Sequence, residues 1–454
     1  MGAAHAQRTN RHSVAAGSTA MLSWLCHLLV LTSCCSKKQH HSSTLCFTSS
    51  CTTTAAAAHI PQIVHVYYHK TGYEFCRQFF STLARSLSVS VGTVHSGSSV
   101  FATPTGHAFA NFLNALTIAP IVAAHVDFSL IMEATPAMYL ATPPSEATAP
   151  RVGSTTPVRL LHFVRDVRRL AVSGFLYHSQ DNVPKTERWL QETDPCSELS
   201  AFAATPNESA GRISISQLSI NLLTKASVKT DDMGSKLRRW VAFLQLPHAE
   251  ARFAEMLDQC VTLRKLALKL ASESQKEQRN VNYMYGLRAL RRVNDSAALQ
   301  LDTLRAVPQI LWMAVNAKGL HALENDLFRV RQVTLDNFSA SASGIDMGSA
   351  SSDDLVRNWY QSKMRELLSF LLGDEHHITP GSLEQIAQNI TKVSFVPPSH
   401  AIAKATYLAK TKSSHFTNAM VSDSKRRSWY MQLADGSSAL SAVLLHANVA
   451  LGFQ

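Results

Sequence analysis

A short run between an apolar segment and a helical one has the composition of an anion-binding loop. It reads His69-Lys70-Thr71-Gly72 and combines an ammonium, a hydroxyl and a glycine. Backbone N–H groups in such a turn, together with the positive end of the following helix dipole, attract phosphate groups. The run is not a Walker A loop, because no glycine stands five residues before Lys70. It predicts a site for a phosphate or a related anion.

An arginine and a serine form a second candidate for anion binding. Arg165 follows another apolar run, and Ser173 comes eight residues later. If a helix begins just after the arginine, the hydroxyl lies about two turns into it. An Arg-Asp pair at the end of a strand is more often a surface ion pair than a phosphate clamp. The two candidate loops are therefore more informative together than either is alone.

Both loops follow segments that are typical of buried parallel strands. Residues 62–68 are rich in β-branched and aromatic side chains, and residues 158–164 are apolar. After the first loop an apolar stripe at Phe75, Phe79, Leu83 and Leu87 predicts a helix, and residues 170–177 continue the second unit as another. Open parallel sheets bind ligands at the carboxyl ends of their strands, which is where both loops are expected.

The remaining segments continue the alternation of strands and helices. We expect a loop over 88–106, helices over 108–124, 237–274, 282–319 and 353–372, and strands over 129–133 and 328–335. Gly373 is expected to stop the helix that precedes it. The sequence therefore predicts an α/β fold with a central parallel sheet flanked by helices.

The two loops resemble motifs of a known enzyme family, the sulfotransferases that use 3′-phosphoadenosine 5′-phosphosulfate. Val64–Gly72 resembles their 5′-phosphosulfate loop, and Phe163–His178 resembles their 3′-phosphate motif, in which an arginine and a serine also stand eight apart. Shorter similarities follow in the family's order at 333–338, 370–373 and 414–417. The resemblance implies the P-loop NTPase-like sulfotransferase fold, here with a helical insertion at about 230–320.

The resemblance also implies roles for individual residues. Lys70 would contact the bridging oxygen of the phosphosulfate, and Thr71, Gly72 and Tyr73 would offer backbone N–H groups to it. The ribose 3′-phosphate would be held by Arg165 and Ser173, with further contacts from Lys410 and Lys412. Sulfuryl transfer develops negative charge on the leaving phosphate, which a fixed ammonium and N–H groups stabilise. No metal ion is expected, since no Cys/His spacing is typical of zinc.

The acceptor hydroxyl needs a general base, and His125 is the first candidate. It follows an apolar run that would deliver it to the cleft, and related enzymes place a histidine about this far beyond the lysine. His107, Glu74 and Glu133 are the alternatives. The acceptor is expected to be a carbohydrate, lipid or small-molecule hydroxyl.

The sequence departs from the family pattern after the glycine. Tyr73 and Glu74 stand where the family has a hydroxyl residue, so a carboxylate enters the neighbourhood of an anionic donor. This departure supports a second hypothesis, a catalytically degenerate protein of the same fold that acts as a nucleotide-binding or interaction module. A small-molecule kinase would need Mg²⁺-binding carboxylates near Lys70, and no Walker B-like strand ending in Asp is evident.

The first 60 residues differ in composition from the rest of the chain. They hold four basic residues, no acidic one and five of the eight cysteines, with an apolar stretch at 20–32. This pattern predicts a targeting or anchor segment of a secretory-pathway enzyme in the Golgi lumen, with a plastid or mitochondrial transit peptide as the alternative. Four glycosylation sequons would fit a luminal glycoprotein, at Asn207, Asn294, Asn337 and Asn389.

Composition and charge narrow the function classes further. The chain has 454 residues, of which 46% are hydrophobic, and no apolar run that allows a multispanning membrane protein. We expect the α/β domain over 61–425 and a helical tail over 426–454. Nucleic acid is not an expected partner, because the basic residues behind the net charge of +11 are scattered along the chain. Cys76, Cys196 and Cys260 are too widely spread to indicate a disulfide framework.

Overall fold

The structure is a computed structural model, and the helices and strands that it describes lie beyond residue 60. It describes residues 61–68, 71, 73–94, 114–116, 119–124, 157–179, 194–206, 233–274, 282–324, 328–334, 338, 352–373, 379–394 and 423–453. The expected targeting segment at 1–60 and the expected strand at 129–133 lie outside these residues.

Five parallel strands form the central sheet. In spatial order they are β2 (Val91–Val94), β3 (Ile121–Ala124), β1 (Ile63–Val66), β4 (Val158–Val164) and β5 (Phe328–Thr334). All four residues of β1 are buried, as expected for a central strand that is covered on both faces. The predicted class, α/β with a central parallel sheet flanked by helices, is confirmed.

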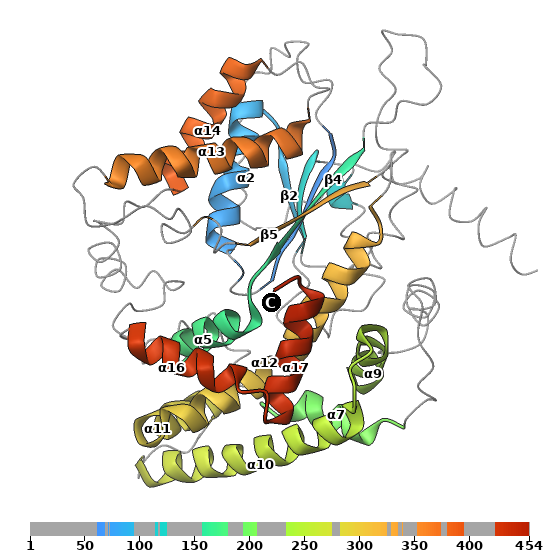
Figure 1. Ribbon diagram of the computed structural model, residues 1–454, viewed down its shortest axis with the longest axis vertical. Helices are drawn as coiled ribbons and strands as arrows, with labels where there is room; N and C mark the ends of the chain where they lie inside the picture. The colour runs from blue at the N-terminus through green and yellow to red at the C-terminus, as the bar shows by residue number, and fades with distance from the viewer. Residues whose placement is uncertain are drawn as a thin grey trace, which may run out of the picture. The chain divides into compact units, whose positions relative to one another are not determined.

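Each face of the sheet packs against its own set of helices (Figure 1). On one face Ile63 and Phe163 share a core with α2 (Tyr73–Leu87), α13 (Ser352–Leu372) and α14 (Pro380–Ser394). On the other face Val64 and Leu160 share a core with α5 (Val167–His178), α12 (Asp295–His321) and α17 (Ala439–Ala450). Alternate residues of β1 and β4 thus enter different cores, because successive side chains of a strand point to opposite faces.

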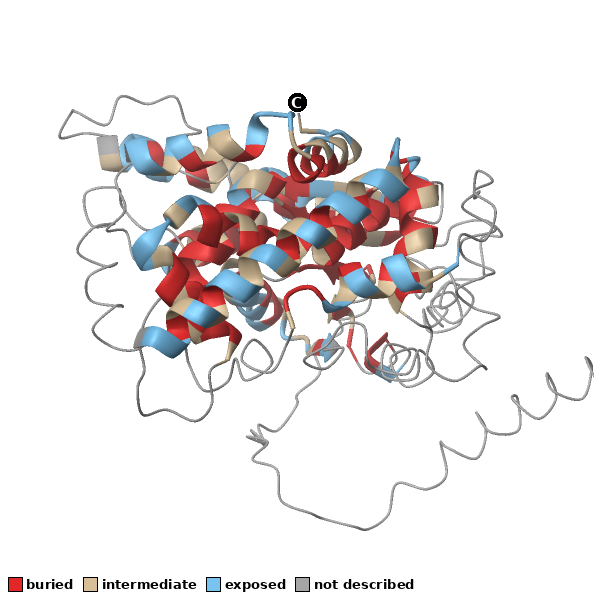
Figure 2. Cartoon of the chain, turned by 90° about the horizontal axis from the view of Figure 1, so that it is seen from below, coloured by how far each residue is buried: buried red, intermediate tan, exposed pale blue. Residues whose placement is uncertain are grey.

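The second core continues into a group of helices that fills the lower half of Figure 1. It comprises α7 (Ser197–Ala204), α9 (Met233–Leu244), α10 (Ala249–Ser274), α11 (Tyr283–Val293), α12, α16 (Asp423–Ala434) and α17. Figure 2 shows buried residues on the inward sides of these helices and exposed residues on their outer sides. At the crossing of α10 and α11, Gly286 leaves little room for a side chain, since a Cβ there would lie 3.3 Å from the Cβ of Ala267. The stretches 237–274 and 282–319 are helical as predicted, but each is divided into two helices, the first at 245–248 and the second at Asn294.

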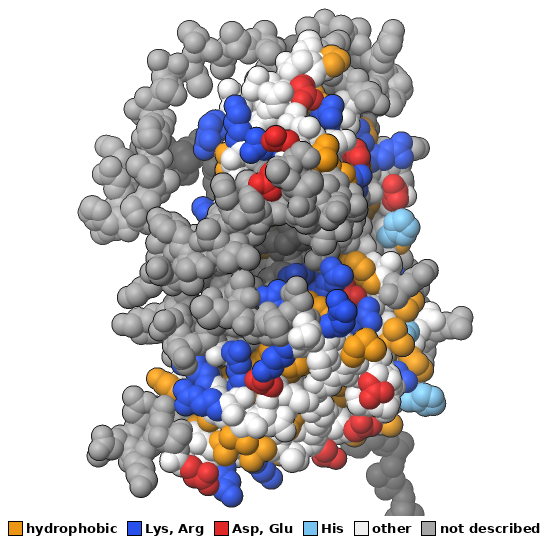
Figure 3. Space-filling model, turned by 60° about the vertical axis from the view of Figure 1, so that its left-hand side comes forward, with side chains coloured by type: hydrophobic (Ala, Val, Ile, Leu, Met, Phe, Trp, Pro, Cys, Tyr) orange, Lys and Arg blue, Asp and Glu red, His pale blue; other side chains and the backbone are white. Residues whose placement is uncertain are grey.

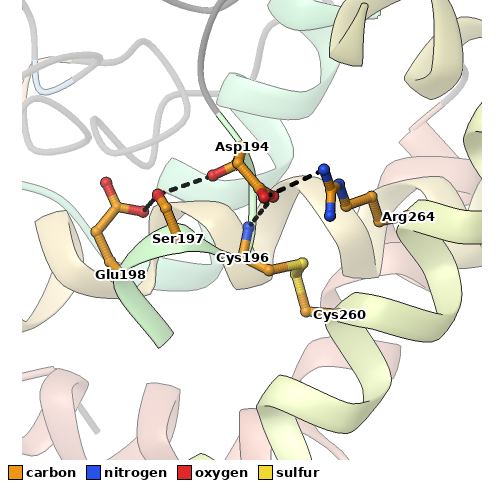
Figure 4. The surroundings of a disulfide bond; sticks show 6 residues. All are labelled: Asp194, Cys196, Ser197, Glu198, Cys260 and Arg264. Carbon is orange, nitrogen blue, oxygen red and sulfur yellow. Dashed lines mark hydrogen bonds and ion pairs between the residues drawn. A yellow bond between two sulfur atoms is a disulfide. The ribbon is translucent and has the colours of Figure 1, made fainter. Parts of the chain in front are cut away.

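A disulfide joins α7 to α10 (Figure 4). Cys196 and Cys260 are both buried and are separated by 64 residues in the chain. The carboxylate of Asp194 accepts a hydrogen bond from the Cys196 backbone N–H at 3.0 Å and pairs with Arg264 of α10 at 3.2 Å. The wide spacing of the cysteines gave no sign of this bond, because only the packing of the helices brings the two sulfur atoms together. Cys76 is a free, buried cysteine.

Two further expectations need correction, and both concern short strands. Residues 91–94 form the edge strand β2 inside the stretch expected as a loop. The stretch 108–124, expected as a helix, has helical residues only at 114–116 where it is described before Ile121, and it ends in strand β3. An apolar run of this kind suits a buried strand as well as a helix, and pairing with β1 and β2 decides in favour of the strand.

The longer elements agree with the sequence pattern. The predicted strands at 62–68, 158–164 and 328–335 appear as β1, β4 and β5, and the predicted helix at 353–372 appears as α13. Gly373 ends α13 with a φ of 68°, a backbone conformation that favours glycine. None of the helices described is long and apolar enough to cross a membrane.

Candidate functional site

The two strands that precede the candidate loops are neighbours in the sheet. The loops follow β1 and β4, which are parallel, with Val66 paired to His162. After β1 the chain continues to the β2 and β3 side, whereas after β4 it continues to β5. The helices that follow the two strands, α2 and α5, pack on opposite faces. Open α/β sheets commonly bind ligands at such a reversal, outside the carboxyl ends of the strands.

Thr71 closes the turn after β1. Its Oγ1 accepts a hydrogen bond from the Tyr68 backbone N–H at 3.0 Å and donates one to the Tyr68 carbonyl at 2.9 Å. The Thr71 backbone N–H also donates to that carbonyl, at 3.3 Å. Thr71 is fully buried, so its hydroxyl orders the loop from within.

Tyr68 anchors the same turn to the helical core. Its hydroxyl accepts a hydrogen bond from Asn316 Nδ2 of α12 at 2.9 Å and lies 2.7 Å from His162 Nε2 of β4. The ring packs edge-on against Trp312, with centroids 4.9 Å apart. All four side chains are buried. The position of the loop before α2 therefore depends on residues up to 248 positions away in the chain.

Asp166 shapes the turn after β4 by capping α5. Its carboxylate accepts hydrogen bonds from the backbone N–H groups of Arg168 and Arg169 at 2.8 and 3.1 Å. It also pairs with the Arg168 guanidinium at 2.7 Å. Asn448 of α17 completes the cap: its Oδ1 accepts from the Val167 N–H at 2.8 Å, and its Nδ2 donates to Asp166 at 3.2 Å. The protein's own carboxylate and amide thus occupy the first N–H groups of α5.

Charge and burial oppose each other at Asp166. Burial raises the pKa of this carboxyl, but the hydrogen bonds from Arg168 and Arg169 outweigh it, and the pKa is lower than usual. The same contact raises the pKa of Arg168. Asp166 is therefore ionised at neutral pH and belongs to the helix cap.

Two buried histidines lie on β1 and β4. Burial lowers the pKa of His65 to about 3, with a smaller contribution from His162, and burial lowers the pKa of His162 to about 3 as well. His65 is stacked between Tyr67 and Phe80, with ring centroids 5.3 and 4.8 Å away. Neither of its ring nitrogens has a hydrogen-bond partner among the described residues. Both imidazoles are neutral and 1% exposed, so they belong to the core beside the loops.

The predicted site residues fall into two groups. Arg165 lies directly after β4 and is partly buried, and Ser173 is partly exposed in the second turn of α5. Tyr73 and Glu74 begin α2, but their side chains are not among those described. The other candidates lie outside the described residues; they are Lys70, Gly72, His107, His125, Glu133, Lys410 and Lys412. Of the predicted site residues, Thr71, Arg165 and Ser173 are thus described, and they follow the neighbouring strands β1 and β4 in the chain.

The residues that support the site were not predicted from the sequence. Tyr68 was included only as part of the strand, and Asn316, His162 and Asn448 carry no local signal, because each contacts a partner that is distant in the chain. The sequence does carry a signal for the Asp166 cap, since an Asp just before an apolar helical stretch is a common N-cap.

A second buried polar cluster ties the far end of α5 to α11 and α12. Asp302 accepts hydrogen bonds from the Tyr283 hydroxyl at 2.9 Å and from Arg305 Nε at 3.1 Å, and lies 2.9 Å from His178 Nδ1. Burial raises the pKa of Asp302, but His178 and Arg305 together outweigh it and hold the pKa well below the usual range. The cluster fixes α5 at the end opposite to the candidate site.

No group of three or more His, Cys, Asp or Glu that could hold a metal ion occurs within the described ranges. Comparisons with protein-family models, with curated proteins and with solved structures find no match to this chain. The functional interpretation therefore depends on the residues at the carboxyl ends of β1 and β4.

Proposed function

We propose that the protein is a sulfotransferase that moves a sulfuryl group from 3′-phosphoadenosine 5′-phosphosulfate to a hydroxyl of a carbohydrate, lipid or small molecule. The observation that carries this proposal is the adjacency of β1 and β4, the two strands that precede the motif loops. The two motif loops are far apart in the sequence, yet they follow two paired strands at the point where the chain reverses direction across the sheet. A nucleotide with phosphates at both its 5′ and 3′ positions needs two anion sites at such a point.

The described residues fit such a donor at the turn after β4. Arg165 comes directly after β4 and carries a guanidinium, and Ser173 lies about 9 Å further along the helix axis than the first residue of α5, at a rise of about 1.5 Å per residue. The long arginine side chain and the serine hydroxyl are thus able to approach one phosphate from two sides. A guanidinium pairs with phosphate through two parallel hydrogen bonds, which makes arginine well suited to the 3′-phosphate.

The proposed reaction is an in-line transfer. The acceptor oxygen attacks the sulfur, the bond between sulfur and the bridging phosphate oxygen breaks, and the acceptor proton passes to a base, for which His125 is the first candidate. The products are a sulfate ester and 3′-phosphoadenosine 5′-phosphate. In this proposal Lys70 neutralises the charge that develops on the leaving phosphate oxygen, a type of stabilisation that commonly contributes several kcal/mol.

The disulfide supports the secretory pathway as the compartment. Disulfides persist in oxidising environments such as the lumen of the secretory pathway, and the Cys196–Cys260 bond is buried. This favours the secretory interpretation of residues 1–60 over the transit-peptide alternative, with Golgi residence as part of the proposal.

The α5 cap favours the second candidate function, a catalytically degenerate nucleotide-binding protein. Asp166 and Asn448 occupy the N–H groups that a phosphate could otherwise use at that helix end, and a carboxylate there repels an anion. Such a protein would bind the nucleotide through Lys70 and Arg165 without transferring sulfate.

Calorimetry with 3′-phosphoadenosine 5′-phosphate tests the donor site in the full chain. We expect Lys70→Ala and Arg165→Ala each to weaken binding about 10- to 100-fold, since a charge-assisted hydrogen bond contributes about 1.5–3 kcal/mol. Arg357→Ala is the matched control, because Arg357 is exposed on α13, a helix on the opposite face of the sheet from α5. If the folded parent protein does not bind the nucleotide, the proposal is wrong.

Transfer of radiolabelled sulfate to a panel of hydroxyl acceptors then separates the two candidates. For the enzyme we expect product with the parent protein and a loss of turnover in His125→Ala, with the nucleotide affinity unchanged. Nucleotide binding without transfer to any acceptor of the panel would favour the degenerate protein.

A further inference from the structure

Two groups of three cations lie on two helices that pack on the second core, α11 and α16. We call them the basic cluster; they are Arg288, Arg291 and Arg292 of α11 and Lys425, Arg426 and Arg427 of α16. The two groups are far apart in the sequence but meet at Asp295, the first residue of α12. Arg291 pairs with that carboxylate at 3.5 Å, and Lys425 pairs with it as well.

The basic cluster stands on a rigid apolar base. The Arg291 guanidinium lies 5.5 Å from the ring centroid of Phe175 on α5, and the Lys425 ammonium lies 5.4 Å from the ring of Trp429. The two rings pack edge to face, with centroids 5.3 Å apart, and both residues are buried. Arg291 also donates to the Ser179 hydroxyl at 2.6 Å. These contacts hold two of the six cations in place at the seam between α5, α11 and α16.

The basic cluster carries far more positive than negative charge. The stretches 283–295 and 423–434 contain six basic and two acidic residues, a formal charge of +4. Arg292, Lys425 and Arg427 are exposed to solvent. Figure 3 shows lysine and arginine side chains at the top, in the middle and at the lower left of one face of the molecule.

The three cations of α16 stand at the unfavourable end of their helix. They lie within its first five residues, next to the positive end of the helix dipole. A cation there typically costs about 0.3–1 kcal/mol at an exposed position. A local arrangement that opposes stability is more common at functional surfaces than elsewhere. A bound anion would neutralise both the side chains and the dipole.

We propose that the basic cluster binds an anionic polysaccharide. A polymer with regularly spaced sulfate or carboxylate groups can contact several of the six cations at once. A nucleic acid is the less suitable polyanion, because the aromatic rings that these cations cover, Phe175 and Trp429, are buried and do not offer a surface for base stacking. The disulfide also indicates an oxidising compartment, in which anionic glycans are available and nucleic acids are not. The proposal does not depend on sulfuryl transfer.

Heparin titrations at several salt concentrations test the proposal in the full chain. The variant combines Arg292→Gln, Arg426→Gln and Arg427→Gln, which leaves the two cations with the described anchoring contacts, Arg291 and Lys425, in place. The control removes three exposed cations from α13 and α14 through Arg357→Gln, Arg365→Gln and Lys392→Gln. We expect the variant to lose at least 10-fold in heparin affinity and the control to change less than 2-fold. The slope of log affinity against log salt should also fall by roughly three in the variant, because three contacts are lost and each releases about one counterion fewer.

Three results would overturn the proposal. An equal loss of affinity in the variant and the control would show that only net charge matters. Tighter binding of a single-stranded DNA of matched charge than of heparin would show that the ligand class is wrong. Absence of heparin binding by the parent protein at low salt would exclude the site, whatever the result for nucleotide binding at the sheet edge.

A footprinting experiment on the parent protein keeps the test independent of how the variant folds. Phenylglyoxal modifies accessible arginines, and mass spectrometry locates the products. We expect heparin to protect Arg292 and Arg427 and to leave Arg357 and Arg365 reactive. Equal protection at all four positions would contradict a localised site.

Discussion

The two buried histidines predict how the stability of the fold depends on pH. His65 and His162 have a pKa of about 3 in the folded protein and an ordinary value of 6.5 in the unfolded chain. Between these values the unfolded chain binds more protons than the folded protein, so the free energy of unfolding falls as the pH falls below 6.5. Each histidine contributes a slope of about 1.36 kcal/mol per pH unit.

The magnitude can be worked out for one histidine at a time. Between pH 7 and pH 5 the buried imidazole of His65 should lower the free energy of unfolding by about 2 kcal/mol, because protonation of the unfolded chain becomes strongly favoured below pH 6.5. The variant His65→Leu removes this titration and keeps an apolar side chain in the aromatic surroundings of Tyr67, Phe80 and Phe163. Its stability should therefore depend less on pH, by about 2 kcal/mol over that range.

Urea denaturation followed by circular dichroism at pH 7, 6 and 5 measures this slope. A loss of stability in His65→Leu that is the same at all three pH values would reflect repacking of the core. The decisive quantity is therefore the slope of the free energy of unfolding against pH. His321→Gln is the control, since the side chain of His321 is 83% exposed in the folded protein. If His65→Leu and the parent protein had the same pH slope, the neutral buried state of His65 would be refuted.

Three other variants test contacts that hold the candidate site. Asn448→Ala should lower the free energy of unfolding by about 2–4 kcal/mol in urea denaturation, because it removes the acceptor of the buried Val167 N–H and the amide donor to Asp166. The control is the exposed neighbour, and Val449→Ala should change the free energy of unfolding little. Tyr68→Phe should lower the free energy of unfolding by a similar amount, since it removes the hydrogen bonds of the Tyr68 hydroxyl. The same variant should weaken nucleotide binding in calorimetry. An unchanged nucleotide affinity would argue against a role of Tyr68 in positioning the donor loop. Reduction of the disulfide should lower stability by about 4 kcal/mol for a loop of 64 residues, and a variant with Ala at both disulfide positions should show no response to a reductant.

The sequence by itself determined the strands and helices that carry the two motif loops. β1 and β4 are buried on both faces and therefore read as short apolar runs, and the helices after them show apolar residues at helical spacing. The positions of Thr71, Arg165 and Ser173 relative to these elements followed directly, because the chain between them is short. The α/β class was predictable for the same reason.

The tertiary structure decided which distant residues meet. The strand order places β1 beside β4, and no pattern within either strand encodes that pairing. The same holds for the contact of Asn448 with the α5 cap, for the Cys196–Cys260 disulfide and for the meeting of the cations of α11 and α16 at Asp295. Propensity and spacing report on neighbours within a few residues. These contacts span tens to hundreds of residues, and they form only when the apolar faces of the helices are buried together, because that burial fixes the orientation of each helix.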